Sequence, residues 1–185
     1  QARRDARRER DVPVRVRWPA GEGPCALIVH SHGLGGNRDG GDVWGRAWQQ
    51  AGIAVLHLQH AGSDTEVLRS GMRALRAAAS AEQLRARVAD MQFAIDEITR
   101  RAQQREPGWS RVRLDALGAA GHSFGASTVQ ALAGQRLCYR CRIRYVISLK
   151  LCARDCSDAA CAPHEPRQAS AIRRTLAKRT SRPAR

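Results

Sequence analysis

A serine between two glycines limits most strongly what this chain can fold into. The segment Gly121-His122-Ser123-Phe124-Gly125 directly follows the apolar run at 114–120, which has the length and composition of a short buried strand. After it, apolar residues return at helical spacing until Gly134, which predicts a helix that ends at a glycine. The chain is therefore expected to pass from strand to helix through one tight turn that carries Ser123.

The same five residues fit the G-x-S-x-G pattern of a nucleophile, with Ser123 in that role. Glycines are needed on both sides because a cramped strand-to-helix turn leaves no room for side chains at either end. An ordinary loop serine is the alternative, since serine beside glycine is also common in turns. The strand before the motif and the helix after it favour the nucleophile.

A second glycine-rich segment is expected to complete the site. The apolar run at 25–29 predicts a buried strand, and it leads into His30-Ser31-His32-Gly33-Leu34-Gly35-Gly36-Asn37. Glycines allow backbone N–H groups to converge on one point, which in acyl transfer is the oxyanion of the tetrahedral intermediate. The expected donors are the N–H groups of Leu34 and Phe124. A phosphate-binding loop is the alternative, but neither G-x-x-x-x-G-K-[ST] nor G-x-G-x-x-G occurs in the chain.

Three ordered motifs resemble the α/β-hydrolases grouped with dienelactone hydrolases and platelet-activating-factor acetylhydrolases. They lie at 31–36, 52–60 and 121–126, and the resemblance covers about residues 12 to 134. It implies a mostly parallel sheet flanked by helices, and hydrolysis of carboxylic esters by a Ser-Asp-His triad. It also gives Ser123 the place of the nucleophile and gives Leu34 and Phe124 the places of the oxyanion donors. Dienelactone hydrolases proper use cysteine, so the serine points to the lipase- and esterase-like branch.

Periodicity elsewhere predicts the same α/β class of fold. Residues 12–18 alternate apolar and polar side chains as a half-exposed edge strand does, whereas 53–58 is apolar enough for a buried strand. Ser80 and Gln83 predict a capping box for a long helix that ends before Glu106-Pro107-Gly108. Its apolar stripe consists of Leu84, Val88, Met91, Ile95, Ile98 and Ala102. Strands that alternate with helices imply parallel pairing.

Four further residues are candidates for the wall of the substrate pocket. His32 and Gly33 belong to the glycine-rich loop, His122 precedes the serine, and Asp64 follows the strand at 53–58. Ligands bind at that end of the strands in α/β sheets. A structural hydrogen-bonding role is favoured for His32. His122 is a poor candidate for the base because its side chain is expected to point away from that of Ser123.

Other residues near the site have sequence patterns that point less clearly to a functional role. Trp44 and Trp48 could wall the pocket, although plain packing is favoured for both. The alanine-rich segment 71–79 could form a lid. His57 and His60 are three apart near a strand, so their side chains are expected on opposite faces and could not share a metal.

The acid and base of a triad are hard to find in this sequence. In this fold both follow the serine in chain order, but the only later histidine is His164 and the only later acids are Asp155, Asp158 and Glu165. Asp158 and His164 are too close to belong to two successive parallel strands, since a crossover takes about a dozen residues or more. The chain is therefore expected to turn over esters poorly or not at all.

The last part of the chain differs in composition from the rest. Residues 136–185 hold five of the six cysteines and are rich in arginine, without amphipathic order. We therefore expect an N-terminal part of an α/β-hydrolase domain at 1–135, incomplete at its C-terminus, and a non-native or disordered tail at 136–185. A frameshift in a GC-rich gene would produce such a tail, and 30 arginines against 2 lysines suit that kind of genome.

A zinc- or nucleic-acid-binding protein is the alternative function. The tail offers Cys138, Cys141, Cys152, Cys156, Cys161 and His164 as ligands, with arginines around them. Their spacing matches no common zinc finger or ribbon. A disulfide-stapled secreted module is also conceivable, but it would leave one tail cysteine unpaired unless Cys25 takes part.

The length and the net charge of the chain limit the number of domains and the kinds of partner that are expected. A chain of 185 residues with 43% hydrophobic content suits one domain. The net charge of +15 arises mostly in the tail and in the arginines at 3–10, which are expected to form a solvated, frayed segment or a local helix. No membrane span, cofactor or nucleic-acid partner is predicted, and the expected ligand is a small-molecule or lipid ester. Because residue 1 is Gln, a segment before it could be missing, and the sequence leaves a cytoplasmic or exported location open, as well as the oligomeric state.

Overall fold

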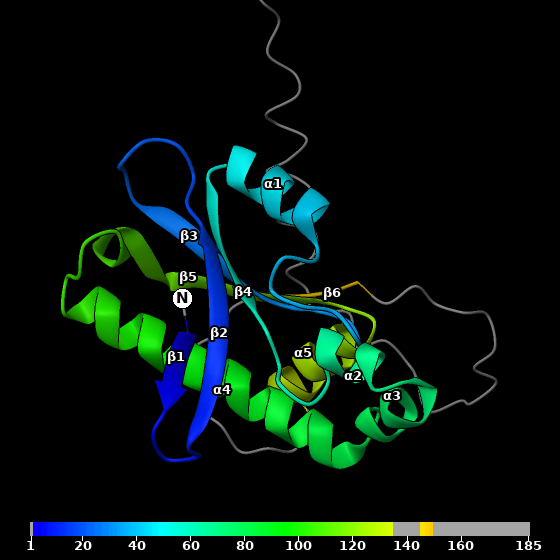
Figure 1. Cartoon of the computed structure of the whole chain (residues 1–185). Helices are drawn as coiled ribbons and strands as arrows, with labels where there is room; N and C mark the ends of the chain where they lie inside the picture. The colour runs from blue at the N-terminus through cyan, green and yellow to red at the C-terminus, as the bar shows by residue number, and fades with distance from the viewer. Residues whose placement is uncertain (1, 135–144, 150–185) are drawn as a thin grey trace, which may run out of the picture. The chain divides into compact units, whose positions relative to one another are not determined.

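A mixed six-stranded sheet organises the chain (Figure 1). The computed structural model describes residues 2–134 and 145–149. The strands are β1 (Ala2–Asp5), β2 (Arg10–Arg17), β3 (Cys25–Ser31), β4 (Ile53–Leu58), β5 (Val112–His122) and β6 (Tyr145–Leu149). They lie in the order β1-β2-β4-β3-β5-β6. Strands β4, β3, β5 and β6 pair in parallel, whereas β1 and β2 pair antiparallel with each other and β2 with β4. The predicted α/β class with a mostly parallel sheet is confirmed.

Helices cover both faces of this sheet. They are α1 (Asp42–Gln50), α2 (Thr65–Arg69), α3 (Met72–Ala78), α4 (Ala81–Gln103) and α5 (Phe124–Gly134), with a 3-10 turn η1 at Trp109–Arg111. Side chains alternate between faces along a strand, so Val29 of β3 points to the core with α4 and α5, whereas His30 points to α1. Helix α3 occupies the alanine-rich segment for which a lid was considered.

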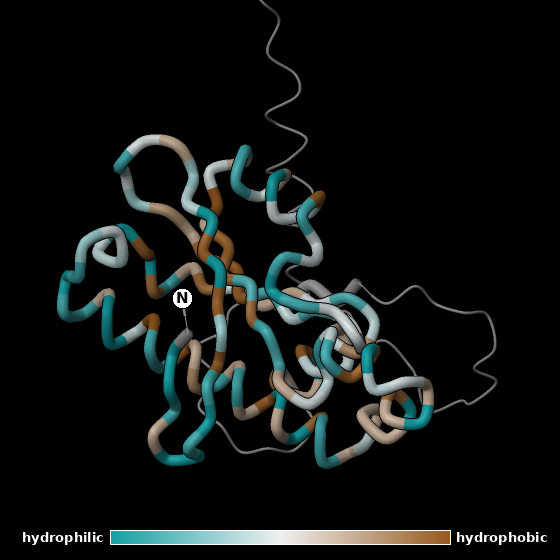
Figure 2. The backbone as a smooth tube through the Cα atoms, viewed as in Figure 1, coloured by the Kyte–Doolittle hydropathy of each residue, from teal (hydrophilic) through white to brown (hydrophobic). Residues whose placement is uncertain are grey.

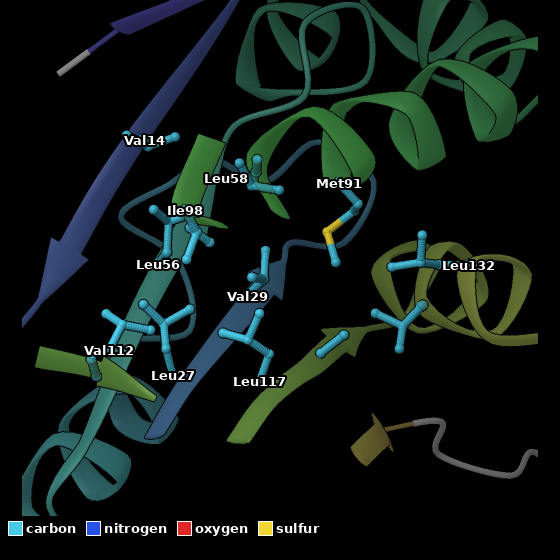
Figure 3. Close-up of a cluster of buried hydrophobic side chains, with 14 of the residues drawn as sticks. Val14, Leu27, Val29, Leu56, Leu58, Met91, Ile98, Val112, Leu117 and Leu132 are labelled. Carbon is cyan, nitrogen blue, oxygen red and sulfur yellow. The ribbon is translucent and has the colours of Figure 1, made fainter. Parts of the chain in front are cut away.

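The apolar core lies between the central strands and α4 (Figure 3). Leu27, Val29, Leu58 and Leu117 of the sheet are fully buried, and Met91 of α4 packs with them. Figure 2 shows the same concentration of apolar residues along the central strands. Full burial of a side chain of this size stabilises a fold by about 1.5–3 kcal/mol, so this layer holds the strand ends that carry the site in place.

The N-terminal segment differs from its prediction. Residues 2–5 form the edge strand β1 and pair with residues 10–13 of β2, so the edge strand predicted at 12–18 has a second neighbouring strand over its first residues. The arginines here are not frayed, because Asp90 of α4 accepts hydrogen bonds from Arg8 Nη1 at 2.8 Å and from Arg10 Nε at 2.9 Å. The prediction failed because a single buried carboxylate, distant in sequence, draws these arginines onto the domain.

The start of α4 confirms half of the predicted capping box. Ser80 is the N-cap, and its Oγ accepts a hydrogen bond from the N–H of Gln83 at 3.2 Å. The reciprocal bond is absent: Gln83 Oε1 has no hydrogen-bond partner among the described residues. The Gln83 amide group lies against Gly62 instead, where a Cβ atom would collide with it.

Candidate active site

Ser123 occupies a strained turn between β5 and α5. Its φ is 53°, in the left-handed region that L-residues other than glycine, asparagine and aspartate seldom adopt. Its carbonyl accepts the first hydrogen bonds of α5, from the N–H groups of Ala126 and Ser127. The side chain is exposed at this turn although both adjoining elements are packed in the domain. The predicted passage from strand to helix is therefore present, with the serine at its apex.

The two glycines of the motif are required by close packing. A Cβ atom on Gly121 would overlap the backbone of Gly125, and one on Gly125 would overlap the carbonyl of Ser31. Any larger residue at either position would push α5 away from β5 or from β3. The turn thus depends on glycine for space, while the unusual φ belongs to Ser123 itself.

The glycine-rich loop lies directly beside the serine. A Cβ atom on Gly33 would be 3.4 Å from the Cβ of Ser123, so the two backbones approach closely. In the same loop, Leu34 N–H has no hydrogen-bond partner among the residues that the structure describes. Phe124 is the first residue of α5, where an N–H has no partner within the helix and carries part of the positive end of the helix dipole.

The loop is held by its neighbours after β4. Gly35 N–H donates to the Ser63 carbonyl at 2.9 Å, and Asn37 Nδ2 donates to Thr65 Oγ1 at 3.1 Å. Asp64, a pocket candidate from the sequence, is buried, forms a bridge with Gly36 and accepts a hydrogen bond from Gln59. These contacts place Asp64 in the support of the loop.

His32 is buried behind the loop with both ring nitrogens engaged. Its Nε2 accepts the backbone N–H of His60 at 3.0 Å, so its Nδ1 carries the proton and donates to the Gly33 carbonyl at 2.6 Å. Burial, with smaller contributions from the neighbouring His60 and Arg87, lowers the pKa of His32 to about 3. The imidazole is therefore neutral and locked, which suits a structural role.

His122 and Trp44 lie next to each other beside the glycine-rich loop, where a Cβ atom on Gly33 would be 3.2 Å from His122 Nδ1. The Trp44 ring is 5.5 Å from that of His122 and 6.3 Å from that of His30. Trp44 is 36% exposed, whereas Trp48 is half-buried against His30. Helix α1 thus brings one partly exposed aromatic ring next to the residue that precedes Ser123.

A buried polar network, which the sequence interpretation missed, lies behind the loop. Arg87 of α4 is fully buried and donates to Ser63 Oγ at 2.8 Å, Thr128 Oγ1 at 3.0 Å, Ser31 Oγ at 3.1 Å and the His32 carbonyl. Burial lowers the pKa of Arg87 to about 9, against the opposing charge of Asp90, so the guanidinium remains charged at neutral pH. A signal was present in the sequence, because Arg87 and Asp90 lie on the line of α4 that adjoins its apolar stripe, where both are buried.

The network ends at a buried carboxylate. Ser31 Oγ accepts from Arg87, so its hydroxyl donates to His60 Nε2 at 3.0 Å, and His60 Nδ1 donates to Asp90 Oδ2 at 2.9 Å. Burial lowers the pKa of His60 to about 4, although its hydrogen bond to Asp90 acts in the opposite direction. Ser31, His60 and Asp90 resemble a triad in their contacts, but all three are buried and no substrate could reach Ser31.

Ser123 has no activating partner within 2–134 and 145–149. In these ranges no imidazole or carboxylate is hydrogen-bonded to its hydroxyl, and no group of three or more potential metal ligands is found. The candidate base His164, the acids Asp155, Asp158 and Glu165, and the tail cysteines lie outside the described residues. Strand β6 belongs to the segment 136–185 and pairs with β5. None of the helices in the described ranges is both long and apolar enough to cross a bilayer.

Solved structures with a similar fold are hydrolases. The 2,6-dihydroxy-pseudo-oxynicotine hydrolase is 19% identical with a TM-score of 0.51, and the match covers 72% of this chain and 32% of that chain. A ferulic acid esterase from Streptomyces cinnamoneus is 26% identical with a TM-score of 0.50, over 66% and 35% of the two chains. A dienelactone hydrolase from Anabaena variabilis is 17% identical with a TM-score of 0.50, over 74% and 57%.

These matches concern three-dimensional structure. No protein-family model matches the sequence, and no curated protein matches it either. The chain spans between about a third and just over half of the length of the three solved hydrolases. Its sheet order, its strained serine turn and these structural neighbours together show that the chain has an α/β-hydrolase fold of the kind found in dienelactone-hydrolase-like proteins.

Proposed function

We propose that the chain is a serine hydrolase of carboxylic esters that works through an acyl-enzyme on Ser123. The observation that carries the proposal is the left-handed φ of 53° at this exposed serine, directly beside the glycine-rich loop. Backbone strain of this kind costs about 1–3 kcal/mol and persists where the surroundings enforce it, often at active sites. The 26% identity to a ferulic acid esterase adds support for esters as the substrate class.

The proposed reaction follows from the groups around the serine. The Ser123 hydroxyl would attack the ester carbonyl as a base takes its proton, and the N–H groups of Leu34 and Phe124 would stabilise the oxyanion. Collapse of the intermediate would release the alcohol and leave the acyl group on Ser123, from which water would remove it. No cofactor is required for these steps, and a small-molecule or lipid ester supplies both the acyl and the alcohol groups.

Turnover by this chain is proposed to be impaired because the base is not found among the described residues. The neutral, locked imidazole of His32 and the buried one of His60 are both committed to structural hydrogen bonds. Loss of a triad member leaves only the residual rate that the oxyanion hole and substrate binding supply, about 10³–10⁴-fold over water. Esterase activity is therefore expected to be weak but dependent on Ser123.

The proposal is tested with two probes on the whole chain. Hydrolysis of 4-nitrophenyl acetate should be slow and should fall to background in Ser123→Ala. An aryl fluorophosphonate should slowly transfer its phosphonyl group to the Ser123 oxygen with release of fluoride, detected by intact mass and peptide mapping. Ser127→Ala, one turn further along α5, is the matched control and should behave as the wild type. Labelling or hydrolysis that survives in Ser123→Ala would refute the assignment.

A fast reaction would also be informative. Robust hydrolysis that depends on Ser123 would support the nucleophile but refute the impairment, and it would require a base in the segment after residue 134. Variants His164→Gln and Asp158→Asn would then identify the base and the acid.

A further inference from the structure

Arg87 is buried at the point where the structural supports of the serine turn and of the glycine-rich loop meet. We propose that Arg87 is a positioning residue that fixes the Leu34 and Phe124 N–H groups relative to each other. The inference rests on the proposed function, because it assigns a purpose to the network behind that oxyanion hole. It concerns how the donors are held rather than which residues react.

The contacts of Arg87 join three segments that are distant in sequence. Its Nη2 binds Ser31 Oγ and the His32 carbonyl at the start of the glycine-rich loop. Its Nη1 binds Ser63 Oγ in the segment after β4, and the Ser63 carbonyl in turn accepts the N–H of Gly35. The same guanidinium therefore restrains the loop from both sides of Leu34.

The third segment is the start of α5. Arg87 Nε donates to Thr128 Oγ1, which itself donates to the Phe124 carbonyl at 2.9 Å. The Arg87 guanidinium carbon also lies 4.8 Å from the centre of the Phe124 ring. Phe124 is thus held through its carbonyl and through its ring, while its N–H is one of the two proposed oxyanion donors.

A contribution of the Arg87 charge to stability alone does not account for this arrangement. Buried ion pairs seldom add net stability, and an apolar residue at position 87 would extend the apolar stripe of α4. Arginine instead supplies five N–H donors in a rigid planar fork, which suits a residue that must fix several acceptors at once. A hydrogen-bond chain through Ser31 and His60 connects Arg87 to Asp90 inside the domain.

The two halves of the hole also pack closely against each other through backbone. Gly125 of α5 packs on the carbonyls of Ser31 and His32, with no side chain of its own to fix its position. Weakening of the Arg87 contacts would let α5 and the loop shift relative to each other. A displacement of about 1 Å at reacting groups can cost about 100-fold in rate.

The test compares the rate of phosphonylation of Ser123 in the whole chain. Arg87→Met should lower the maximal labelling rate by at least about tenfold and leave the half-saturating concentration of the fluorophosphonate nearly unchanged. Thr128→Val removes the hydrogen bonds of Thr128 Oγ1 to Arg87 and to the Phe124 carbonyl with little change in shape, and should lower the rate by about threefold. Arg87→Lys should restore part of the loss seen in Arg87→Met. Arg85→Met, exposed on the same helix, is the matched control.

Two further measurements separate positioning from stability and from the proposed function. Ile98→Val lowers stability in the core away from the turn and should keep the wild-type labelling rate. Amide hydrogen exchange in peptides spanning 31–36 and 123–128 should accelerate in Arg87→Met and Thr128→Val, whether or not Ser123 reacts. Wild-type labelling rates and exchange in all Arg87 and Thr128 variants would overturn the inference, whereas absent labelling of folded wild type would overturn the proposed function.

Discussion

Ser123 carries its backbone strain in a position where glycine would be relaxed. Both neighbouring elements are anchored by close contacts, so the turn cannot open to relieve the strain. An L-residue in the left-handed region costs about 1 kcal/mol relative to glycine, and that cost is retained here at the one exposed hydroxyl of the turn. At the residue scale, close packing on both sides therefore holds Ser123 in a strained backbone conformation.

The backbone strain at Ser123 predicts that glycine is more stabilising than alanine at this position. Ser123→Gly should be more stable than Ser123→Ala by about 1 kcal/mol, because glycine adopts the left-handed φ without strain. At Ser127, within α5, the order should be reversed, since glycine in a helix is about 0.5–1 kcal/mol worse than alanine. Urea unfolding of the four variants measures both differences. Equal stability of the two Ser123 variants would mean that the turn is not strained.

The close approach at Gly125 gives a second prediction at the same scale. Gly125→Ala should destabilise the fold by about 1–3 kcal/mol or more, because the new Cβ would collide with the Ser31 carbonyl. Gly23→Ala is the control, since a Cβ atom there meets nothing within 4 Å. Thermal and urea unfolding provide the comparison. If both variants unfolded at the same midpoint, the packing of α5 on β3 would have to be looser than described.

At the scale of elements, helix α4 both packs against the core and supports the site. Its stripe of Val88, Met91 and Ile98 closes the core, while Arg87 and Asp90 on an adjoining line hold the glycine-rich loop and the N-terminal hairpin. Burial by itself would raise the pKa of Asp90, but hydrogen bonds from His60 and Arg10 hold it below its usual value. One helix thus connects the stability of the core to the geometry of the site.

The first turn of α4 is expected to depend on its cap. Ser80→Ala should lower stability by about 1 kcal/mol, because the Gln83 N–H loses its acceptor. Ser110→Ala, at an exposed position of η1, should change stability by less than about 0.5 kcal/mol. Urea unfolding monitored by far-ultraviolet circular dichroism measures the two effects. A neutral Ser80→Ala would show that the remainder of the first turn holds the helix alone.

The whole domain buries four histidines in neutral form. Burial lowers the pKa of His30 and His32 to about 3 and that of His57 and His60 to about 4, from 6.5 in the unfolded chain. Below pH 6.5 these histidines therefore bind protons in the unfolded state but remain neutral in the folded state. Stability from these groups is fully present above pH 6.5 and is lost as the pH falls toward about 4 for His57 and His60 and toward about 3 for His30 and His32.

Acid sensitivity in this range is the prediction for the whole molecule. The urea midpoint should fall steeply between pH 7 and pH 5, with each histidine contributing up to about 1.4 kcal/mol per pH unit. His30→Phe keeps an aromatic ring against Trp44 and Trp48, removes one of these groups, and should flatten the slope. An unchanged midpoint from pH 7 to pH 5 would contradict the neutral burial of the histidines.

Local patterns were enough to predict the main elements. The predicted strands at 25–29, 53–58 and 114–120 lie within β3, β4 and β5, and the long helix is α4, because periodicity and caps depend on neighbouring residues alone. Strand β1 was missed because its four residues, Ala2–Asp5, show no apolar alternation. The support of the loop by Arg87 was missed because an arginine beside an apolar stripe is explained only by the acceptors that folding brings to it.

The sequence by itself determined the α/β class and the strand-turn-helix around Ser123, because periodicity and glycine spacing act within a few residues. Only the tertiary structure decided that His32 and His60 are locked in hydrogen bonds and that Arg87 joins β3, the segment after β4 and α5. Buried polar groups must find partners, and the partners available to them are set by packing rather than by nearness along the chain.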